Sequence, residues 1–400
     1  MQQRQLFLSH LAQTSDFPLC IEVEKAEGVW LYGPDGQAYM DLIAGIGVSN
    51  VGHRHPKVVA AIHAQVDRYL HTMVYGEYVQ SPQVLLAEAL VGTLAAWQTP
   101  SGHAIDNVYL TNSGAEAVEG AMKLAKRYTG RTEILSCFNA YHGSTQGALS
   151  LAGAEFFKRP FRPLLPDIGH LRHGQPDDLG SITNKTAAVI IEVIAGEAGV
   201  RVPAQAYLQA LRERCTETGT LLIFDEIQTG FGRTGTFWAF EDYGVVPDVL
   251  LAAKGMGGGM PIGAFMAPQA LMQVFKNNPI LGHITTFGGH PVSAAASLAA
   301  LQVIRDERLC ETVAAKAELF RSLLVHPAIR EIRHKGLMMA VEFSDFDTLK
   351  RIIDRGIANG VITDWFLFCD NSMRIAPPLT ITEAEIREAC GVLVRGMERV

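Results

Sequence analysis

The stretch Leu221-Leu-Ile-Phe-Asp-Glu-Ile-Gln-Thr-Gly230 decides the fold, because it joins four consecutive apolar residues directly to two carboxylates and an amide. Such a run, ending in polar residues and a glycine, predicts a strand that is buried on both faces and reaches the surface at its carboxyl end. Strands of this kind occur in parallel sheets covered by helices. Ligands of these sheets bind at the carboxyl ends of the strands, so Asp225 and Glu226 mark the place where we expect a site.

Similar short apolar runs lie on both sides of this stretch and alternate with segments of helical periodicity. These runs are at 107–110, 133–135, 187–191 and 249–251. They predict an α/β fold with a mostly parallel central sheet flanked by helices. Segments 20–23 and 29–32 predict a small antiparallel β element. The last hundred residues predict a smaller α/β domain, with helices near 292–305, 310–324 and 347–358 and strands at 338–343 and 373–375.

Length and composition exclude several classes of protein. The chain has 400 residues, 34 Lys and Arg against 41 Asp and Glu, a net charge of −7 and 48% hydrophobic residues, which fits one or two globular domains. There is no basic run, so we expect no nucleic-acid partner. The most apolar stretch, 247–268, contains Asp248, Lys254 and a triple glycine, so we expect no membrane-spanning segment.

The cysteine pattern predicts a cytoplasmic protein. The six cysteines lie far apart, form no Cys-x-x-Cys pair and follow no recognisable secretory leader. This spacing supports neither a disulfide framework nor a zinc ribbon. His53 and His55 have no third ligand at a suitable spacing, so we expect no metal site.

A phosphate site is indicated after the first of the apolar runs. The segment Thr111-Asn-Ser-Gly-Ala-Glu-Ala117 places a capping serine and small residues before a helical run that extends to Arg127. The free N–H groups and the dipole of a helix N-terminus attract anions, and small residues let a phosphate approach. From this segment alone, an ordinary helix cap without a ligand is an equal alternative.

The carboxylates that end the 221–224 run are expected to have different tasks, because successive side chains of a strand point to opposite faces. A buried carboxylate needs a partner, and Asp225 is the one that we place in the site. A role for Asp225 as a helix cap or a metal ligand stays open at this point.

A lysine ends the next apolar run. Lys254 follows 248–253 and precedes Gly255, Gly257, Gly258 and Gly259. Burial among small residues lowers the pKa of an amine, which favours Schiff-base chemistry. A solvated lysine before a glycine loop is the alternative. An anion site, a carboxylate and an amine on one sheet are together the requirements of pyridoxal phosphate, whose aldehyde, phosphate and ring nitrogen each need a partner.

The chain resembles the class III pyridoxal-phosphate-dependent aminotransferases, the group of ornithine, acetylornithine and 4-aminobutyrate transaminases, from about Gly28 to the C-terminus. The motifs that carry the resemblance are Gly52-His-Arg-His-Pro56, Asn112-Ser-Gly-Ala-Glu-Ala117, Tyr141-His-Gly143, Asp225-Glu-Ile-Gln-Thr-Gly230, Gly232-Arg-Thr-Gly235, Lys254-Gly255, Thr286-Phe-Gly-Gly289 with Pro291, and Arg374-Ile-Ala-Pro-Pro378. The resemblance implies fold-type I and transamination. It also implies a domain of both chain ends, 1–48 and 296–400, beside a large domain at 49–295.

The resemblance implies cofactor contacts at matching positions. Lys254 would form the Schiff base and move the proton, and Asp225 would pair with the ring nitrogen. Gln228 would contact the phenolic oxygen and Tyr141 would stack on the ring. The phosphate would be bound by Ser113, Gly114 and Ala115. His142 would support the stacked ring, and Glu192 would lie behind the cofactor.

The resemblance also implies how substrates and a second subunit are used. Arg374 would bind the α-carboxylate of an amino donor such as glutamate, and of a keto-acid acceptor, while Glu197 pairs with Arg374 between substrates. Thr285 is expected on the substrate side. Thr286 would reach the phosphate of the neighbouring subunit, which makes the enzyme a homodimer.

Two departures from the family pattern affect the substrate. Ser144 stands where the ornithine and acetylornithine branch has an arginine that recognises a second, distal carboxylate, and Ile46 stands where the ornithine enzymes tend to have an aromatic residue. A decarboxylase, racemase or aminomutase on the same scaffold is the alternative reaction. A nucleotide-binding protein is a less favoured alternative, because the chain has neither a Walker sequence nor a Gly-x-Gly-x-x-Gly turn.

Overall fold

A computed structural model describes residues 3–398, and its largest element is a seven-stranded sheet. In spatial order the strands are β4 (Asn107–Thr111), β10 (Gly263–Ala267), β9 (Val249–Ala252), β8 (Leu221–Asp225), β7 (Thr186–Glu192), β5 (Glu133–Cys137) and β6 (Ile168–Leu171). Strand β10 is antiparallel to both of its neighbours, whereas the other pairs are parallel. The predicted α/β architecture with a mostly parallel sheet is confirmed.

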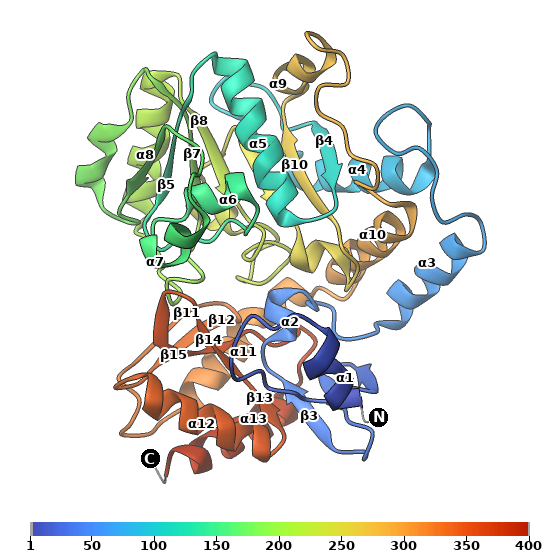
Figure 1. Cartoon of the computed structure of the whole chain (residues 1–400), viewed down its shortest axis with the longest axis vertical. Helices are drawn as coiled ribbons and strands as arrows, with labels where there is room; N and C mark the ends of the chain where they lie inside the picture. The colour runs from blue at the N-terminus through green and yellow to red at the C-terminus, as the bar shows by residue number, and fades with distance from the viewer. Residues whose placement is uncertain (1–2, 399–400) are drawn as a thin grey trace.

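Helices cover both faces of this sheet (Figure 1). The α-helices are α1 (Gln3–His10), α2 (Ala44–Gly47), α3 (Pro56–Val66), α4 (Ser81–Leu94), α5 (Gly114–Thr129), α6 (Gln146–Leu151), α7 (Glu155–Lys158), α8 (Gln205–Thr218), α9 (Gln269–Met272), α10 (Pro291–Asp306), α11 (Leu309–Leu323), α12 (Phe346–Ala358) and α13 (Glu383–Met397). Short 3₁₀ turns are η1 (Arg159–Phe161), η2 (Pro176–Ser181), η3 (Ala239–Tyr243), η4 (Lys254–Gly257) and η5 (Gln273–Lys276).

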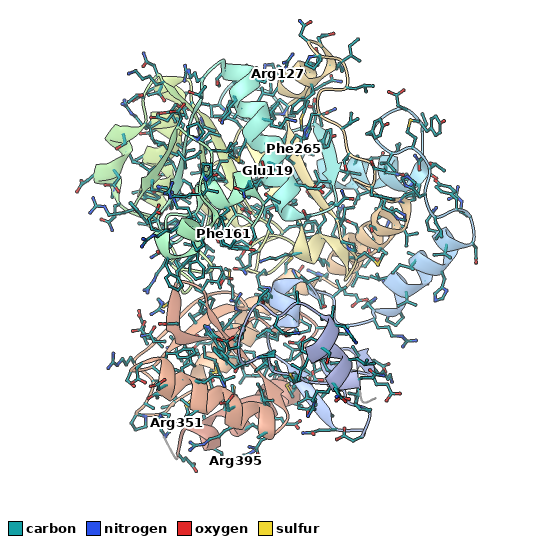
Figure 2. All side chains as sticks on the ribbon, viewed as in Figure 1. Glu119, Arg127, Phe161, Phe265, Arg351 and Arg395 are labelled. Carbon is teal, nitrogen blue, oxygen red and sulfur yellow. The ribbon has the colours of Figure 1, made fainter. Side chains whose placement is uncertain are left out.

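The alternation of side chains along β8 determines which face each carboxylate takes. Ile223 packs in the core cluster shared with α5, and Phe224 packs in the cluster shared with α8. Phe265 of β10 also lies under α5 (Figure 2), where Gly120 leaves room for its ring, because a Cβ there would lie 2.3 Å from the ring edge. Continuing the alternation puts Asp225 on the α5 face and Glu226 on the other.

Two smaller sheets lie below the large one in Figure 1, where the blue N-terminal and red C-terminal elements lie together. One sheet has the order β1 (Lys25–Glu27), β2 (Trp30–Tyr32), β3 (Ala38–Asp41), β13 (Val361–Ile362). The other has the order β11 (Glu331–Lys335), β12 (Met338–Glu342), β15 (Cys369–Ile375), β14 (Asp364–Phe366). Because β13 pairs with β3 in parallel, the two ends of the chain share one sheet.

A buried arginine, Arg233, connects loops that lie between the large sheet and the two smaller sheets. Arg233 donates from Nη1 to the carbonyl oxygens of Leu337, at 3.1 Å, and Pro377, at 2.5 Å, and from Nη2 to Oδ1 of Asn50, at 2.5 Å. Burial lowers the pKa of Arg233 to about 9. The segments that border the site are thus fixed relative to one another by one side chain.

The structure lacks one predicted strand and contains several strands that were not predicted, among them β11, β13 and β14 of the smaller sheets. The strand predicted at 20–23 is wrong: Cys20 has a left-handed φ of 51°, which interrupts an extended backbone, and β1 begins at Lys25. Strands β6 and β10 were not predicted. Gly169 lies within β6 and Gly-Ala begins β10, and glycine and alanine are less common in strands than β-branched and aromatic residues. None of the helices within residues 3–398 combines the length and apolar character that a bilayer crossing requires.

Candidate active site

A cavity of about 500 Å³ lies where β7, β8 and β9 end and α5 begins. Most of the candidate residues line it. They are Ser113, Gly114, Ala115, Tyr141, His142, Glu192, Glu197, Asp225, Gln228 and Lys254, together with Ser144, Val48, Met260 and Ile262. Residues from six separate segments of the sequence therefore meet in one cavity, at the carboxyl ends of the strands as the sheet topology predicts.

Lys254 begins the short turn η4, separated by one residue from the end of strand β9. Its backbone has a left-handed φ of 49°. Its amine makes no hydrogen bond or ion pair with any residue in the described range 3–398. Burial lowers the pKa of Lys254, and although the charges of Glu197 and Asp225 act in the opposite direction, the pKa stays below its ordinary value. The cavity therefore contains an unpaired amine whose neutral, nucleophilic form is favoured.

The carboxylate of Asp225 is buried and held in a defined orientation. Oδ2 lies 2.7 Å from Nδ1 of His142, and Oδ1 accepts a hydrogen bond of 3.0 Å from the backbone N–H of Ile227. The other ring nitrogen of His142 lies 3.2 Å from Oγ of Ser136. The sequence suggested that His142 supports the ring of Tyr141, but its hydrogen bonds are to Asp225 and Ser136.

Glu226, on the opposite face of β8, has a structural task. Its carboxylate accepts hydrogen bonds from the hydroxyl of Thr229 and from the backbone N–H groups of Ala239, at 3.0 Å, and Phe240, at 2.8 Å. It therefore anchors the start of η3. The two adjacent carboxylates have the separate tasks that alternation along the strand predicts.

Glu192, at the end of β7, is a second buried acid beside His142. Its Oε1 accepts a hydrogen bond of 3.1 Å from the N–H of Gly196, and its Oε2 accepts one of 3.4 Å from the N–H of Tyr141. Burial raises its pKa to about 7, although the charge of His142 acts in the opposite direction. Glu192 thus connects the loop after β7 to the loop that contains Tyr141.

The N-terminus of α5 forms one wall of the cavity. Ser113 caps the helix by accepting a hydrogen bond of 3.2 Å from the N–H of Glu116, and the side chain of Glu116 in turn accepts from the N–H of Asn112 at 2.9 Å. Gly114 lets the chain pass close to its neighbour, since a Cβ there would lie 2.8 Å from Ile227. N–H groups of a first helical turn have no partner within the helix, so this wall can bind an anion.

A carboxylate of α5 positions the loop that contains Tyr141. Glu119 lies where α5 faces α6 (Figure 2), and its Oε1 accepts hydrogen bonds from the hydroxyl of Thr145 at 2.6 Å and from the N–H groups of Gly147 and Ala148 at 2.9 and 3.1 Å. A negative charge at a helix N-terminus is stabilising. The preceding residues are thereby fixed beside the cavity, where the hydroxyls of Tyr141 and Ser144 lie 3.2 Å apart.

Glu197 and Arg374 form a buried pair at the edge of the cavity. Nη1 of Arg374 donates to Oε1 of Glu197 at 2.8 Å and Nη2 donates to Oε2 at 3.0 Å. Gln228 donates to Oε1 of the same carboxylate at 3.4 Å. Burial would raise the pKa of Glu197, but Arg374 and Lys254 lower it below its ordinary value, so the carboxylate is held ionised.

Comparison with known proteins decides the family. Residues 11–397 match the family model for "Aminotransferase class-III". The chain belongs to the class III aminotransferases. The reaction of this aminotransferase is therefore transamination, as the motifs predict.

Individual relatives agree with this assignment. The chain is 38% identical over 389 residues to an acetylornithine aminotransferase of Methanopyrus kandleri, covering 96% of this chain and 95% of that one. It is 40% identical over 378 residues to the acetylornithine aminotransferase of Corynebacterium efficiens, covering 93% of this chain and 91% of the relative. These relatives give no support to a decarboxylase, racemase, aminomutase or nucleotide-binding protein.

Solved structures give the same fold. An ornithine aminotransferase of Toxoplasma gondii, crystallised with partial occupancy of PLP at its active site, superposes with a TM-score of 0.89 at 30% identity, over 99% of this chain and 93% of that one. A Bacillus anthracis aminotransferase superposes with a TM-score of 0.91 at 25% identity, over 100% and 98% of the two chains. The predicted fold-type I architecture is confirmed, and the family implies pyridoxal phosphate as cofactor.

The cavity of this aminotransferase fits that cofactor. It offers the unpaired amine of Lys254 for the aldehyde, the first turn of α5 for the phosphate and the oriented carboxylate of Asp225 for the ring nitrogen. No group of three or more His, Cys, Asp or Glu side chains suited to a metal ion occurs among the described residues. His53 and His55 have separate partners, namely Asp41 at 2.8 Å and Glu307 at 3.4 Å.

Three candidate residues lie outside the lining of the cavity. Arg374 lies behind Glu197. Thr285 accepts hydrogen bonds from Asn112, at 3.1 Å, and from the N–H of Gly288, at 3.2 Å, and so supports the start of α5 from behind. Thr286 is exposed on the surface of its own protomer.

Sequence reasoning missed several residues of the aminotransferase site. Met260 lines the cavity with Val48 and Ile262 and gives it an apolar wall. Asp364 lies beside Arg374 and was not considered. No local sequence signal points to Asp364, because its contact with Arg374 depends on the register of β14 with β15.

Proposed function

We propose that this aminotransferase holds pyridoxal phosphate through Lys254 and moves an amino group from an amino acid or a terminal amine to a keto acid. When bound, the cofactor withdraws electrons from the carbon that bears the amino group, so that a proton on this carbon becomes acidic. The observation that carries the proposal is the unpaired amine of Lys254, which shares one cavity with Asp225 and the N-terminus of α5.

Lys254 has two tasks in this proposal. Its lowered pKa favours the neutral amine, which would hold the cofactor through its aldehyde in the resting enzyme. Once a donor amine had displaced it, the same nitrogen would take the proton from the donor carbon that bears the amino group and deliver it to the carbon of the cofactor's former aldehyde group. A single base of this kind suffices, because each transfer moves one proton over a short distance.

The surrounding residues hold and orient the cofactor. Asp225, fixed by His142, would keep the ring nitrogen protonated, because a carboxylate beside a ring nitrogen favours its charged form. Ser113, Gly114 and Ala115 would bind the phosphate through the first turn of α5. Ring contacts would come from Tyr141, Gln228 and Glu192, which line the same cavity.

Substrate carboxylates would be bound by Arg374. Its two Nη atoms now bind Glu197 in the bidentate manner that a substrate carboxylate would use. Glu197 would therefore turn away when an α-carboxylate enters and return when the substrate has none. An α-amino acid and the corresponding keto acid are the donor and acceptor classes that this arrangement suits, because each has a carboxylate next to the reacting carbon.

The other end of the donor meets no cation from its own protomer. Among described residues, the cavity lining includes Lys254 but no arginine, and Ser144 is hydrogen-bonded to Tyr141. The relatives are named acetylornithine aminotransferases, yet we infer that donors with a distal carboxylate, such as N-acetylornithine and 4-aminobutyrate, are poor substrates here.

We also propose a homodimer in which Thr286 contributes to the partner's phosphate site. Thr286 is exposed, and it lies in a segment where Ile280 is 75% exposed and Leu281, Ile284 and Phe287 are exposed as well. Val79, 95% exposed, belongs to a second such segment. Exposed apolar side chains in this number are typical of a subunit interface.

We also propose a division into two domains and a location in the cytoplasm. The pairing of β13 with β3 supports a small domain of 1–48 and 296–400, of which residues 1, 2, 399 and 400 lie outside the described residues. The boundary at 295 falls inside α10, so a helix would join the two domains. All six cysteines are free, which supports a reducing cytoplasm.

The test is a half-reaction. Purified enzyme given an amino donor without an acceptor is expected to release one keto product per active site and then stop, until a keto acid is added. Continuous release of carbon dioxide would show a decarboxylase, and change of stereochemistry without any keto product would show a racemase. Either result would contradict the proposal.

A further inference from the structure

Arg374 is bound by two carboxylates, of which only Glu197 faces the cavity. Asp364 approaches from the other side, with Oδ1 at 2.9 Å from Nε of Arg374. Asp364 lies on β14 directly opposite Arg374 on β15, so the sheet register itself places the two side chains together. The contact is an ion pair, since its angle does not meet that of a hydrogen bond.

The whole of β14 contacts this guanidinium. The carbonyl oxygen of Trp365 accepts a hydrogen bond of 3.1 Å from Nη2, and the ring of Phe366 lies 4.7 Å from the central carbon of the guanidinium. Trp365 is itself packed edge-on against Phe346, with ring centroids 5.2 Å apart. These contacts thus come from a short strand that is paired in register with the strand of Arg374, whereas Glu197 reaches Arg374 from the segment after β7.

Exchange of Glu197 for a substrate would leave Arg374 dependent on these β14 contacts. Arg374 is only 4% exposed, and a buried cation without a counter-charge is strongly destabilising. At the moment when Glu197 has left and the substrate has not yet bound, Asp364 is the carboxylate that still contacts Arg374.

We propose that Asp364 is a positioning residue that keeps the Nη edge of Arg374 directed at the cavity while Glu197 and substrate carboxylates replace each other. The proposal rests on the proposed function, because it takes Arg374 as the carboxylate site. A substrate is fixed at its other end by the cofactor and cannot follow a guanidinium that moves, whereas the Glu197 side chain can. Loss of Asp364 therefore weakens the binding of substrate carboxylates to Arg374 more than it weakens the binding of Glu197.

If Asp364 acted only through its negative charge, its removal would strengthen the binding of substrate carboxylates. Removing a negative charge near Arg374 makes the site more attractive to an incoming carboxylate, so a purely electrostatic role of Asp364 predicts tighter binding after its removal. Burial raises the pKa of Asp364 to about 6, so the side chain is ionised when binding is measured at about pH 8. The direction of the change in affinity therefore distinguishes positioning from simple repulsion.

The experiment compares wild-type holoenzyme with Asp364→Asn and with Asp370→Asn, a control that removes an exposed carboxylate from the neighbouring strand β15. Calorimetry measures the affinity for glutarate, a dicarboxylate that cannot be transaminated. We expect glutarate to bind about tenfold more weakly to Asp364→Asn and unchanged to Asp370→Asn, since small misplacements in a site cost factors of this order or more. A half-reaction with a primary amine that has no carboxylate should stay within about twofold of wild type.

Equal or tighter glutarate binding by Asp364→Asn would overturn the proposal, as would an equal loss in the primary-amine half-reaction, because that would indicate general damage to the site. These outcomes differ from a failure of the proposed function. If wild-type enzyme released no keto product from any donor, the proposed function would be wrong regardless of the variants. If wild type transaminates and the two variants behave alike, only the role of Asp364 is wrong.

Discussion

His142 and Asp225 are joined by a contact of 2.7 Å between Nδ1 and Oδ2, and both side chains are buried. Burial would lower the pKa of His142, but the hydrogen bond to Asp225 and the charges of Asp225 and Glu192 raise it above its ordinary value. The charged form of the imidazole is therefore favoured beside the carboxylate. His142, the residue after Tyr141, thus orients the carboxylate that we assign to the ring nitrogen.

We expect His142→Asn to lower kcat about tenfold, because a hydrogen bond to a charged group contributes on the order of 1.5–3 kcal/mol. Steady-state kinetics at saturating cofactor measure this effect. Ser136→Ala, which removes only the 3.2 Å contact to the far nitrogen of His142, is the matched control and should have a much smaller effect. Unchanged turnover in His142→Asn would show that Asp225 needs no such support.

Glu192→Gln should change how the stability of the cofactor-free protein depends on pH. The pKa of Glu192 in the folded chain is about 7, raised from an ordinary value near 4.5, so between these values the folded state binds more protons than the unfolded state. The free energy of unfolding of wild type therefore falls as pH rises through this window. Glutamine does not titrate, so the free energy of unfolding of Glu192→Gln does not fall for this reason.

Urea unfolding at several pH values tests this prediction. The free energy of unfolding of Glu192→Gln minus that of wild type should increase from pH 5 to pH 8 by an amount on the order of 2 kcal/mol. Glu388→Gln, at an exposed position of α13, is the control. A difference between Glu192→Gln and wild type that does not vary with pH would contradict the raised pKa.

Ser144→Arg should introduce a site for a distal carboxylate. We expect kcat/KM for N-acetylornithine to rise at least about tenfold, because a charge-assisted bidentate contact is worth more than 1.4 kcal/mol. A donor without a carboxylate should be unaffected, and Ser144→Gln, which is long but uncharged, is the control. If wild type already uses N-acetylornithine efficiently, another residue supplies the distal contact.

Mixed dimers test the proposed role of Thr286 across the interface. Lys254→Ala subunits should be inactive, and Thr286→Val subunits should retain cofactor poorly. A mixed dimer would have one site with an intact Lys254 from one chain and an intact Thr286 from the other, so subunit exchange should restore activity at limiting cofactor. No gain on mixing, in a preparation shown to contain mixed dimers, would indicate that Thr286 acts within its own chain.

Much of the large domain could be predicted from the sequence, because its signals are local. The fully buried strands β7, β8 and β9 are continuous apolar runs, and the residues that end them are the ones that line the cavity. Single apolar runs and single polar residues were ambiguous. Asp225 and Lys254 became informative only when they were considered together on one sheet.

The contacts that depend on distant pairing could not be predicted. The contact of His142 with Asp225 joins residues 83 positions apart, and Asp364 meets Arg374 only through the register of β14 with β15. Strand β10 runs against its neighbours and begins with Gly-Ala, so neither its direction nor its existence followed from periodicity. Such contacts form only when the fold brings distant segments together, and local motifs do not encode them.

The central claim is that Lys254 is the residue that holds the cofactor. The most direct measurement is borohydride reduction of the purified enzyme, followed by proteolysis and mass spectrometry of every lysine-containing peptide. We predict one added pyridoxyl phosphate group on the peptide that contains Lys254, and no addition in Lys254→Ala. A label on another lysine, such as the buried Lys158, or a label that persists in Lys254→Ala, would contradict the claim.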